Sequence, residues 1–111
     1  MTATQTAIKR RKRRKDINHV VYQLSLANTG DTYIGVTVKD STPAKSVQRR
    51  FSKHVHRAFG ENRDWPLCNA IRTHGHSAFD VKVIAVIRGK TAAHAYEREL
   101  IGKIKPTLNI V

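Results

Sequence analysis

The chain has 111 residues and a single cysteine, Cys68. One thiol can form neither an internal disulfide nor a thiolate zinc finger, and we expect Cys68 to be a small buried residue of a helix. No apolar run approaches the roughly 20 residues that a membrane-spanning helix needs. The first residues also lack the apolar core of a signal peptide. These absences predict an intracellular, cytoplasmic protein. The length of 111 residues predicts one domain, large enough for a modest core.

Acidic residues are scarce, because 8 Asp and Glu stand against 21 Lys and Arg, for a formal net charge of +13. Seven of the cations lie within residues 9–15. Residues 16–111 therefore carry 14 cations against 8 acidic groups, a net charge of +6. The electrostatic field of such a positive net charge favours binding to phosphate polyanions, with release of their counterions, and it also attracts anionic membranes. The charge predicts a class of partner but no reaction.

We expect residues 1–16 to form a flexible basic N-terminal arm, ahead of a domain over residues 17–111. Like charges repel any compact form of such an arm. The arm could be a solvated tail or a localisation signal, or it could bind phosphate groups without sequence specificity. Its candidate nucleic-acid-binding cations are Lys9, Arg10, Arg11, Lys12, Arg13, Arg14 and Lys15.

The apolar pattern predicts two strands joined by a tight turn, followed later by a third strand. In residues 20–35, apolar positions alternate on both sides of Asn28-Thr29-Gly30-Asp31, whose residue types favour a turn. Residues 79–87 begin with clean alternation and then become apolar throughout, which indicates a strand that enters two-sided burial.

Three further segments carry helix start and stop signals. Thr42-Pro43 fits an N-cap followed by proline at the first helical position, for a helix to about residue 58. Pro66 could open a shorter helix that Gly75 would cap. Thr91 is the expected N-cap of the last helix, which should end near residue 104. The fold class is therefore α+β, a small three-stranded antiparallel sheet with about three flanking helices.

Two cations interrupt the edge of the apolar stripe in the first helix. Arg50 and His54 are four residues apart and half turned toward the core, where such a pair would suit a partly enclosed anion. Snorkelling of the two side chains explains the pattern nearly as well. Three more cations of this helix point outward and are candidates for contact with a nucleic acid: Arg49, Lys53 and Arg57.

The last helix places a carboxylate, Glu97, where an apolar residue is expected. The other members of this stripe are Ala93, Leu100, Ile101 and Ile104. Burying an unpaired carboxylate is costly. Glu97 could therefore form a salt bridge with an inward cation such as Arg50, or it could bind a hard divalent ion together with water and phosphate oxygens. The pair His74 and His76 has no carboxylate nearby and is a weak candidate for a metal site.

Short motifs in a fixed order resemble those of the GIY-YIG nuclease domain, from about His19 to Asn109. No single motif is specific, whereas the ordered combination is. The motifs are Val20-Val21-Tyr22, Tyr33-Ile34-Gly35, Arg50 followed by His54, Ala70-Ile71-Arg72-Thr73-His74-Gly75, Glu97, and Pro106-Thr107-Leu108-Asn109. The first motif has Val20-Val21 in place of Gly-Ile, which keeps strand character but loses a glycine that permits close backbone approach.

The resemblance implies a small free-standing endonuclease, of phage or mobile-element type, that hydrolyses DNA with water as the nucleophile. It implies Mg²⁺ or Mn²⁺ as the cofactor and Glu97 as the metal ligand. The implied catalytic residues are Tyr22, Tyr33, Arg50, His54, Glu97 and Asn109. The alternative is a non-catalytic basic module that binds nucleic acid with the same fold. A homo-oligomer or a separate partner could supply specificity, and a phage-encoded enzyme would act in the host cytoplasm.

The two tyrosines pose a geometric question. Side chains alternate between the two faces of a strand. Tyr22 therefore shares a face with the apolar residues of its strand, whereas Tyr33 shares a face with Gly35 and Thr37 and not with the apolar residues of its own strand. For both hydroxyls to share one site, the pairing must bring opposite parities together, or a twist or bulge must re-aim one side chain.

Overall fold

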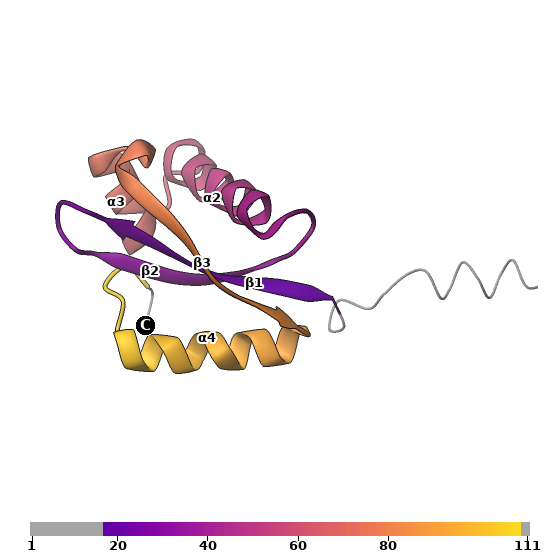
Figure 1. Ribbon diagram of the computed structural model, residues 1–111. Coiled ribbons are helices and arrows are strands. Elements are labelled where there is room, and N and C mark those ends of the chain that lie inside the picture. The colour runs from indigo at the N-terminus through magenta and orange to yellow at the C-terminus, as the bar shows by residue number, and fades with distance from the viewer. Residues whose placement is uncertain (1–16, 110–111) are drawn as a thin grey trace, which may run out of the picture.

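The structure is a computed structural model that describes residues 17–109. Its centre is a three-stranded antiparallel sheet in the order β2-β1-β3 (Figure 1). The elements in chain order are β1 (Asn18–Leu26), β2 (Thr32–Val38), α2 (Pro43–Gly60), α3 (Pro66–His74), the 3₁₀ turn η2 (His76–Ala78), β3 (Phe79–Arg88) and α4 (Lys90–Ile104). The predicted α+β class is confirmed. The proposed basic arm lies outside the described residues.

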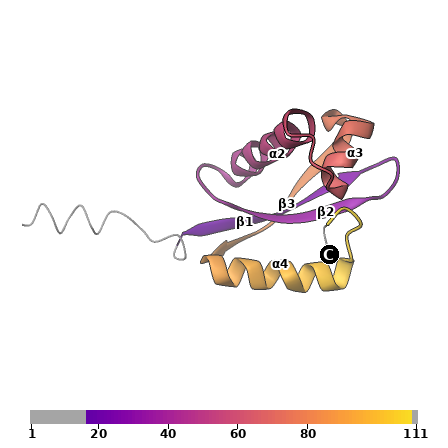
Figure 2. The ribbon, with the colours of Figure 1, turned by 180° about the vertical axis from the view of Figure 1, so that it is seen from behind.

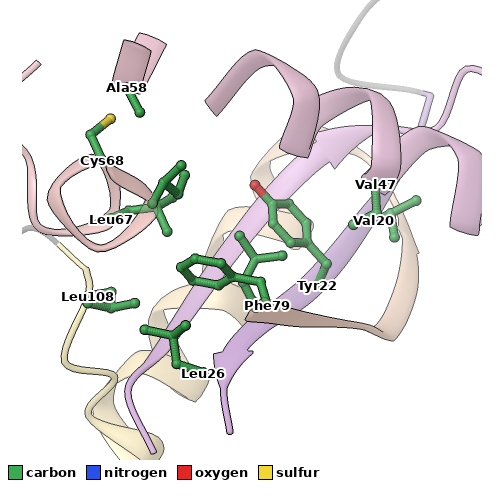
Figure 3. Packing of buried hydrophobic residues seen from close by; sticks show 11 residues of the cluster. Val20, Tyr22, Leu26, Val47, Ala58, Leu67, Cys68, Phe79 and Leu108 are labelled. Carbon is green, nitrogen blue, oxygen red and sulfur yellow. The ribbon is translucent and has the colours of Figure 1, made fainter. Parts of the chain in front are cut away.

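Helices cover both faces of the sheet, with α2 and α3 on one face and α4 on the other (Figures 1 and 2). The main core lies between β1 and the α2–α3 layer (Figure 3). Its buried members are Val20, Tyr22, Leu24, Leu26, Val47, Ala58, Leu67, Cys68, Ile71, Phe79 and Leu108. Cys68 is thus a buried helix residue, as predicted. No helix among those described is both long and apolar enough to cross a membrane.

The register of β1 against β2 resolves the question of the two tyrosines. Tyr22 pairs with Gly35, and Leu24 pairs with Tyr33. Residues directly opposite each other in an antiparallel pair share a face of the sheet. Even-numbered residues of β1 therefore lie beside odd-numbered residues of β2, and both tyrosines point to the face covered by α2. The pairing alone achieves this, without a bulge between these two strands.

The other side of β1 does contain an irregularity. Val21 pairs with Ala85, but Tyr22 pairs with Val83, so Ile84 is an extra residue in β3. An inserted residue of this kind bends the strand and changes which of its side chains face each layer. Val83 accordingly shares the face of Tyr22, whereas Ala85 shares the opposite face with Val21. The apolar run in residues 83–87 thereby contributes apolar side chains to both faces of the sheet.

The observed helix starts and ends differ slightly from the predicted ones. The hydroxyl of Thr42 caps α2 as expected and accepts from the backbone N–H of Lys45 at 3.2 Å. α2 continues to Gly60 rather than ending near residue 58. The expected N-cap Thr91 is wrong, because α4 begins at Lys90 and Gly89 is its N-cap. Gly89 has a φ of 94°, a conformation that glycine adopts without the strain of a side chain.

Two smaller expectations also need correction. Gly75 ends α3 with a positive φ of 82°, but its ψ of 152° lies outside the left-handed helical region that a typical glycine cap occupies. Its N–H nevertheless donates to the carbonyl of Ile71 at 2.8 Å, as a cap should. In α4, Ala93 is buried, whereas Ile104 at the end of the predicted stripe is 43% exposed.

Candidate active site

Two tyrosines and a histidine meet beneath α2. The hydroxyl oxygen of Tyr22 lies 3.1 Å from Nε2 of His54, in a buried hydrogen bond. The ring centroids of Tyr22 and Tyr33 are 6.2 Å apart, and the ring of Tyr33 meets that of His54 edge-on at 5.4 Å. Sequence reasoning placed these three residues in one site, and the structure brings them into contact.

Gly35 makes the convergence of the two rings possible. A Cβ atom at this position would lie 2.6 Å from Cζ and from the hydroxyl oxygen of Tyr22, and 2.8 Å from the ring of Tyr33. Real Cβ atoms essentially never approach other atoms so closely. The glycine of the Tyr33-Ile34-Gly35 motif therefore leaves the space that both tyrosine rings occupy.

Burial shapes the acid–base properties of this cluster. Burial raises the pKa of the Tyr22 hydroxyl, and the neighbouring Tyr33 adds to the effect. For His54, burial lowers the pKa to about 4, and the positive charges of Arg50 and Arg57 act in the same direction. The imidazole of His54 is therefore neutral near pH 7. A neutral ring in contact with a phenol has a nitrogen lone pair that can accept the phenolic proton.

Arg50 supplies the positive charge of the cluster. Its Nε is buried and has no hydrogen-bond partner among residues 17–109. Its charge lowers the pKa of Tyr22 and of Tyr33, against the larger effect of burial. A buried guanidinium donor without a partner is costly, so such an atom calls for an acceptor. An anion bound beside the tyrosines would provide one.

Arg50 also lines a groove of about 610 Å³, which we call the β2-edge groove, whereas the side chains of Tyr22, Tyr33 and His54 are not part of its lining. The lining residues come from α2, α4, β1 and β2 and from the residues next to the two strands. The lining residues are Ile17, His19, Val36, Thr37, Val38, Asp40, Ser46, Arg49, Arg50, Lys53, Lys90 and His94. Asp40 is the single acidic residue of this lining, and its carboxylate is paired with Arg49 at 2.6 Å. The groove is therefore suited to a polyanion.

A second hollow of about 490 Å³ continues the basic surface along α2. Arg49 and Lys53 line both hollows, and Arg57 lines the second one. The three outward cations predicted for this helix thus lie along one continuous surface. The seven cations predicted for the N-terminal arm lie outside the described residues.

Glu97 lies on α4 with a side chain that is 18% exposed. Its Oε1 is 3.2 Å from Nδ1 of His94. No ion pair between Glu97 and Arg50 occurs within 4.0 Å, so the salt bridge considered for this carboxylate is not what the structure contains. Burial raises the pKa of Tyr33, Arg50 opposes this rise, and the negative charge of Glu97 adds to it. Glu97 therefore lies within electrostatic reach of the tyrosine cluster.

The donor set at Glu97 fits a hard divalent ion. Among residues 17–109 no group of three or more His, Cys, Asp and Glu side chains could enclose a metal ion, and His74 and His76 form no such group. Mg²⁺ commonly uses one or two carboxylates and completes its shell with waters and substrate phosphates. A single partly buried carboxylate near a basic groove meets that description.

Asn109 supports the site from the edge of the sheet. Its side-chain amide accepts from the N–H of Ile34 at 2.9 Å and donates to the carbonyl of Ile34 at 2.8 Å. The N–H of Leu108 also donates to the carbonyl of Thr32 at 2.8 Å. These bonds pair the C-terminal segment with the free edge of β2. Asn109 therefore holds the strand that carries Tyr33 and Gly35, and its amide is occupied by backbone groups.

Sequence reasoning missed three residues that line the β2-edge groove: His19, Lys90 and His94. The signal for two of them was available. Lys90, His94 and Glu97 are spaced by four and three residues, which places them on one face of a helix. The prediction from the apolar stripe of this helix included the carboxylate of Glu97 but neither Lys90 nor His94.

The chain is similar to a known family of catalytic domains. The family described as the GIY-YIG catalytic domain matches residues 18–109. Searches of curated proteins and of solved structures returned no match. Proteins with this domain are nucleases that act on nucleic acid and generally use a divalent metal. Because the match spans most of the chain, the protein belongs to the GIY-YIG family and carries a nuclease catalytic domain.

Proposed function

We propose that the protein is a DNA endonuclease that hydrolyses phosphodiester bonds with water and a divalent metal ion. The observation that carries this proposal is the buried hydrogen bond between Tyr22 and His54, beside an unpartnered Nε of Arg50. A protein that only binds DNA requires no hydrogen-bonded phenol and imidazole. It also requires no partly buried carboxylate such as Glu97, which forms no ion pair with Arg50. Hydrolysis requires a proton acceptor, an anion-stabilising cation and a metal ligand.

Arg50 is the residue that binds the scissile phosphate in this proposal. The β2-edge groove delivers the backbone of DNA to α2, where Arg49 and Lys53 neutralise flanking phosphates. The guanidinium of Arg50 then donates to the non-bridging oxygens. It also stabilises the charge that develops on them as water attacks, and such stabilisation is commonly the largest contribution to catalysis.

Tyr22 is the group that removes the proton from the attacking water, and His54 accepts the phenolic proton in turn. An isolated phenol would be a poor base near pH 7, since its pKa is about 10. His54 relieves this limit because Nε2 is within hydrogen-bond distance of the hydroxyl. A bound phosphate would offset the charge of Arg50, which contributes to the low pKa of His54, and the imidazole would then accept a proton more readily.

Glu97 would hold the divalent ion. Such an ion would polarise the scissile phosphate and stabilise the leaving oxygen. Tyr33 lies against both Tyr22 and His54 and would orient the water or a phosphate oxygen. Asn109 would act indirectly, because its hydrogen bonds with Ile34 fix the strand that carries Tyr33.

The test is conversion of supercoiled plasmid to nicked and linear DNA with Mg²⁺ and with EDTA. We expect metal-dependent cutting by the full chain. Arg50→Ala and Glu97→Ala should each lower the rate by at least about 100-fold, while Arg50→Ala keeps most of the DNA affinity. Matched controls are Arg98→Ala and Glu99→Ala, which change exposed side chains of α4 and should cut normally.

Two results would contradict the proposal. One is tight, salt-sensitive DNA binding without cutting of plasmid, RNA or branched DNA, which would identify a binding module. The other is an equal loss of affinity and turnover in Arg50→Ala, which would remove Arg50 from the chemistry.

A further inference from the structure

His94 and Glu97 form a pair on one face of α4. They are three residues apart, which makes them neighbours on the helix surface. Nδ1 of His94 lies 3.2 Å from Oε1 of Glu97. The side chain of His94 is 41% exposed, whereas that of Glu97 is 18% exposed. The imidazole is therefore the more exposed member of the pair, and the carboxylate is the more enclosed one.

His94 also faces the space where a nucleic acid would lie. It lines the β2-edge groove, as does Arg50 of α2. Arg50 is the candidate contact for the scissile phosphate, so the imidazole of His94 borders the same substrate space as that phosphate. Neither the resemblance nor the family match assigns a role to this residue.

The distance between the two side chains suits two ligands of one metal ion. Adjacent ligands of an octahedral ion, each about 2.1 Å from it, are separated by about 3 Å. The observed separation of Nδ1 and Oε1 is 3.2 Å, so little movement would be needed for both atoms to bind one ion. The same distance also fits a hydrogen bond, at the long end of the usual range. An imidazole with its proton on Nε2 leaves the lone pair of Nδ1 for the metal.

We propose that His94 is a second protein ligand of the divalent ion held by Glu97, and that it makes the site select Mn²⁺ over Mg²⁺. This inference rests on the proposed function, because it adds a ligand to the metal site of that mechanism. Both Mg²⁺ and Mn²⁺ favour oxygen ligands, but Mn²⁺ belongs to the first-row transition series, whose members bind imidazole nitrogen, so replacing an oxygen ligand by an imidazole should cost Mn²⁺ less than it costs Mg²⁺. A pair of one carboxylate and one imidazole on a single helix is used in this way in bundle metalloproteins.

The direct test is pulsed electron paramagnetic resonance of the full chain with Mn²⁺ and without DNA. A bound Mn²⁺ ion with an imidazole ligand couples magnetically to the ¹⁴N nucleus. We expect this coupling in the wild-type protein and in His76→Ala, a control that removes an exposed histidine elsewhere. We expect its loss in His94→Ala. A wild-type spectrum without ¹⁴N coupling, or coupling that survives in His94→Ala, would overturn the proposal.

Titrations with Mn²⁺ and with Mg²⁺ separate a ligand from a residue that only positions Glu97. If His94 binds the metal, His94→Ala should weaken Mn²⁺ binding by at least about tenfold and Mg²⁺ binding by less than about threefold. If His94 only donates a hydrogen bond to Glu97, both affinities should fall by the same factor. Equal losses would therefore refute the proposed ligand role.

Failure of this inference is distinguishable from failure of the proposed function. Plasmid cutting that requires Mg²⁺ and Glu97, together with unchanged metal selectivity in His94→Ala, would leave the nuclease mechanism intact and remove His94 from it. A ¹⁴N signal that depends on His94, in a protein that cuts no DNA, would support the metal site and reject the nuclease assignment for it.

Discussion

At the scale of single residues, the site depends on packing as much as on chemistry. Gly35 and the two tyrosine rings illustrate this, because the absent Cβ atom is what lets both rings occupy one face of the sheet. Tyr22 is fully buried, and its hydroxyl is bonded to His54, so its ring cannot easily move aside. The glycine thus affects the catalytic cluster although it contributes no reacting group.

We predict that Gly35→Ala destabilises the fold by about 1–3 kcal/mol through overpacking and lowers the cutting rate. Gly102→Ala is the matched control, since a Cβ at that helical position would meet no atom within 4 Å. It should be neutral or stabilising by up to about 1 kcal/mol, as expected for glycine replaced in an exposed helix. Urea denaturation of both variants measures the difference. Equal stability of the two variants would contradict the packing argument.

His54 gives the protein a defined response to acid. Its pKa is lowered from 6.5 to about 4 in the folded state, so the unfolded chain binds more protons between these values. The stabilising contribution of neutral His54 is present above pH 6.5 and is lost as the pH falls toward 4. The predicted loss is up to about 3 kcal/mol of the free energy of unfolding.

Urea denaturation at a series of pH values tests this prediction, with His54→Gln for comparison. The variant has no titrating group at this position, so its stability should fall less across the same interval. Parallel pH profiles of the wild type and the variant would show that His54 does not titrate as argued.

At the scale of elements, the C-terminal segment acts on the active site through β2. We predict that Asn109→Ala removes both hydrogen bonds to Ile34 and costs about 1–3 kcal/mol of stability. The backbone N–H of Ile34 should exchange with solvent faster, and cutting should slow because Tyr33 is less firmly placed. Asn28→Ala, in the exposed β1–β2 turn, should leave both properties unchanged. Unaltered protection of Ile34 in Asn109→Ala would refute this role.

Local patterns could predict the elements, but not how they meet. Alternation around residues 28–31 and the Thr42-Pro43 signal identify the hairpin and the first helix from neighbouring residues alone. The shared face of Tyr22 and Tyr33 depends on register, which alternation within one strand cannot supply. The partner of Glu97 depends on which side chains approach α4, and it is His94 rather than Arg50. The order of the motifs was enough to predict which residues belong to the site. Which of these residues contact each other could be determined only from the folded structure.

At the scale of the whole molecule, charge should govern DNA affinity separately from catalysis. We predict that removing residues 1–16 lowers DNA affinity and flattens its dependence on salt, by about 0.9 in the logarithmic slope for each phosphate that the shortened chain no longer neutralises. The maximal cutting rate should stay the same, since no candidate catalytic residue lies in that segment. Binding measured between low and moderate salt gives the slope. An unchanged slope would favour a solvated tail or a localisation signal.

The hydrogen bonds of Asn109 also decide where this sheet can grow. Within residues 17–109, the C-terminal segment covers the outer edge of β2 at Thr32 and Ile34, while β3 pairs only with β1. A strand from another chain would therefore find a complete unpaired edge only along β3, because residues 36–38 of β2 line the β2-edge groove. No residue of β3 lines the β2-edge groove. A strand added along β3 would thus extend the sheet on the side away from the β2-edge groove and would leave the groove open to a nucleic acid.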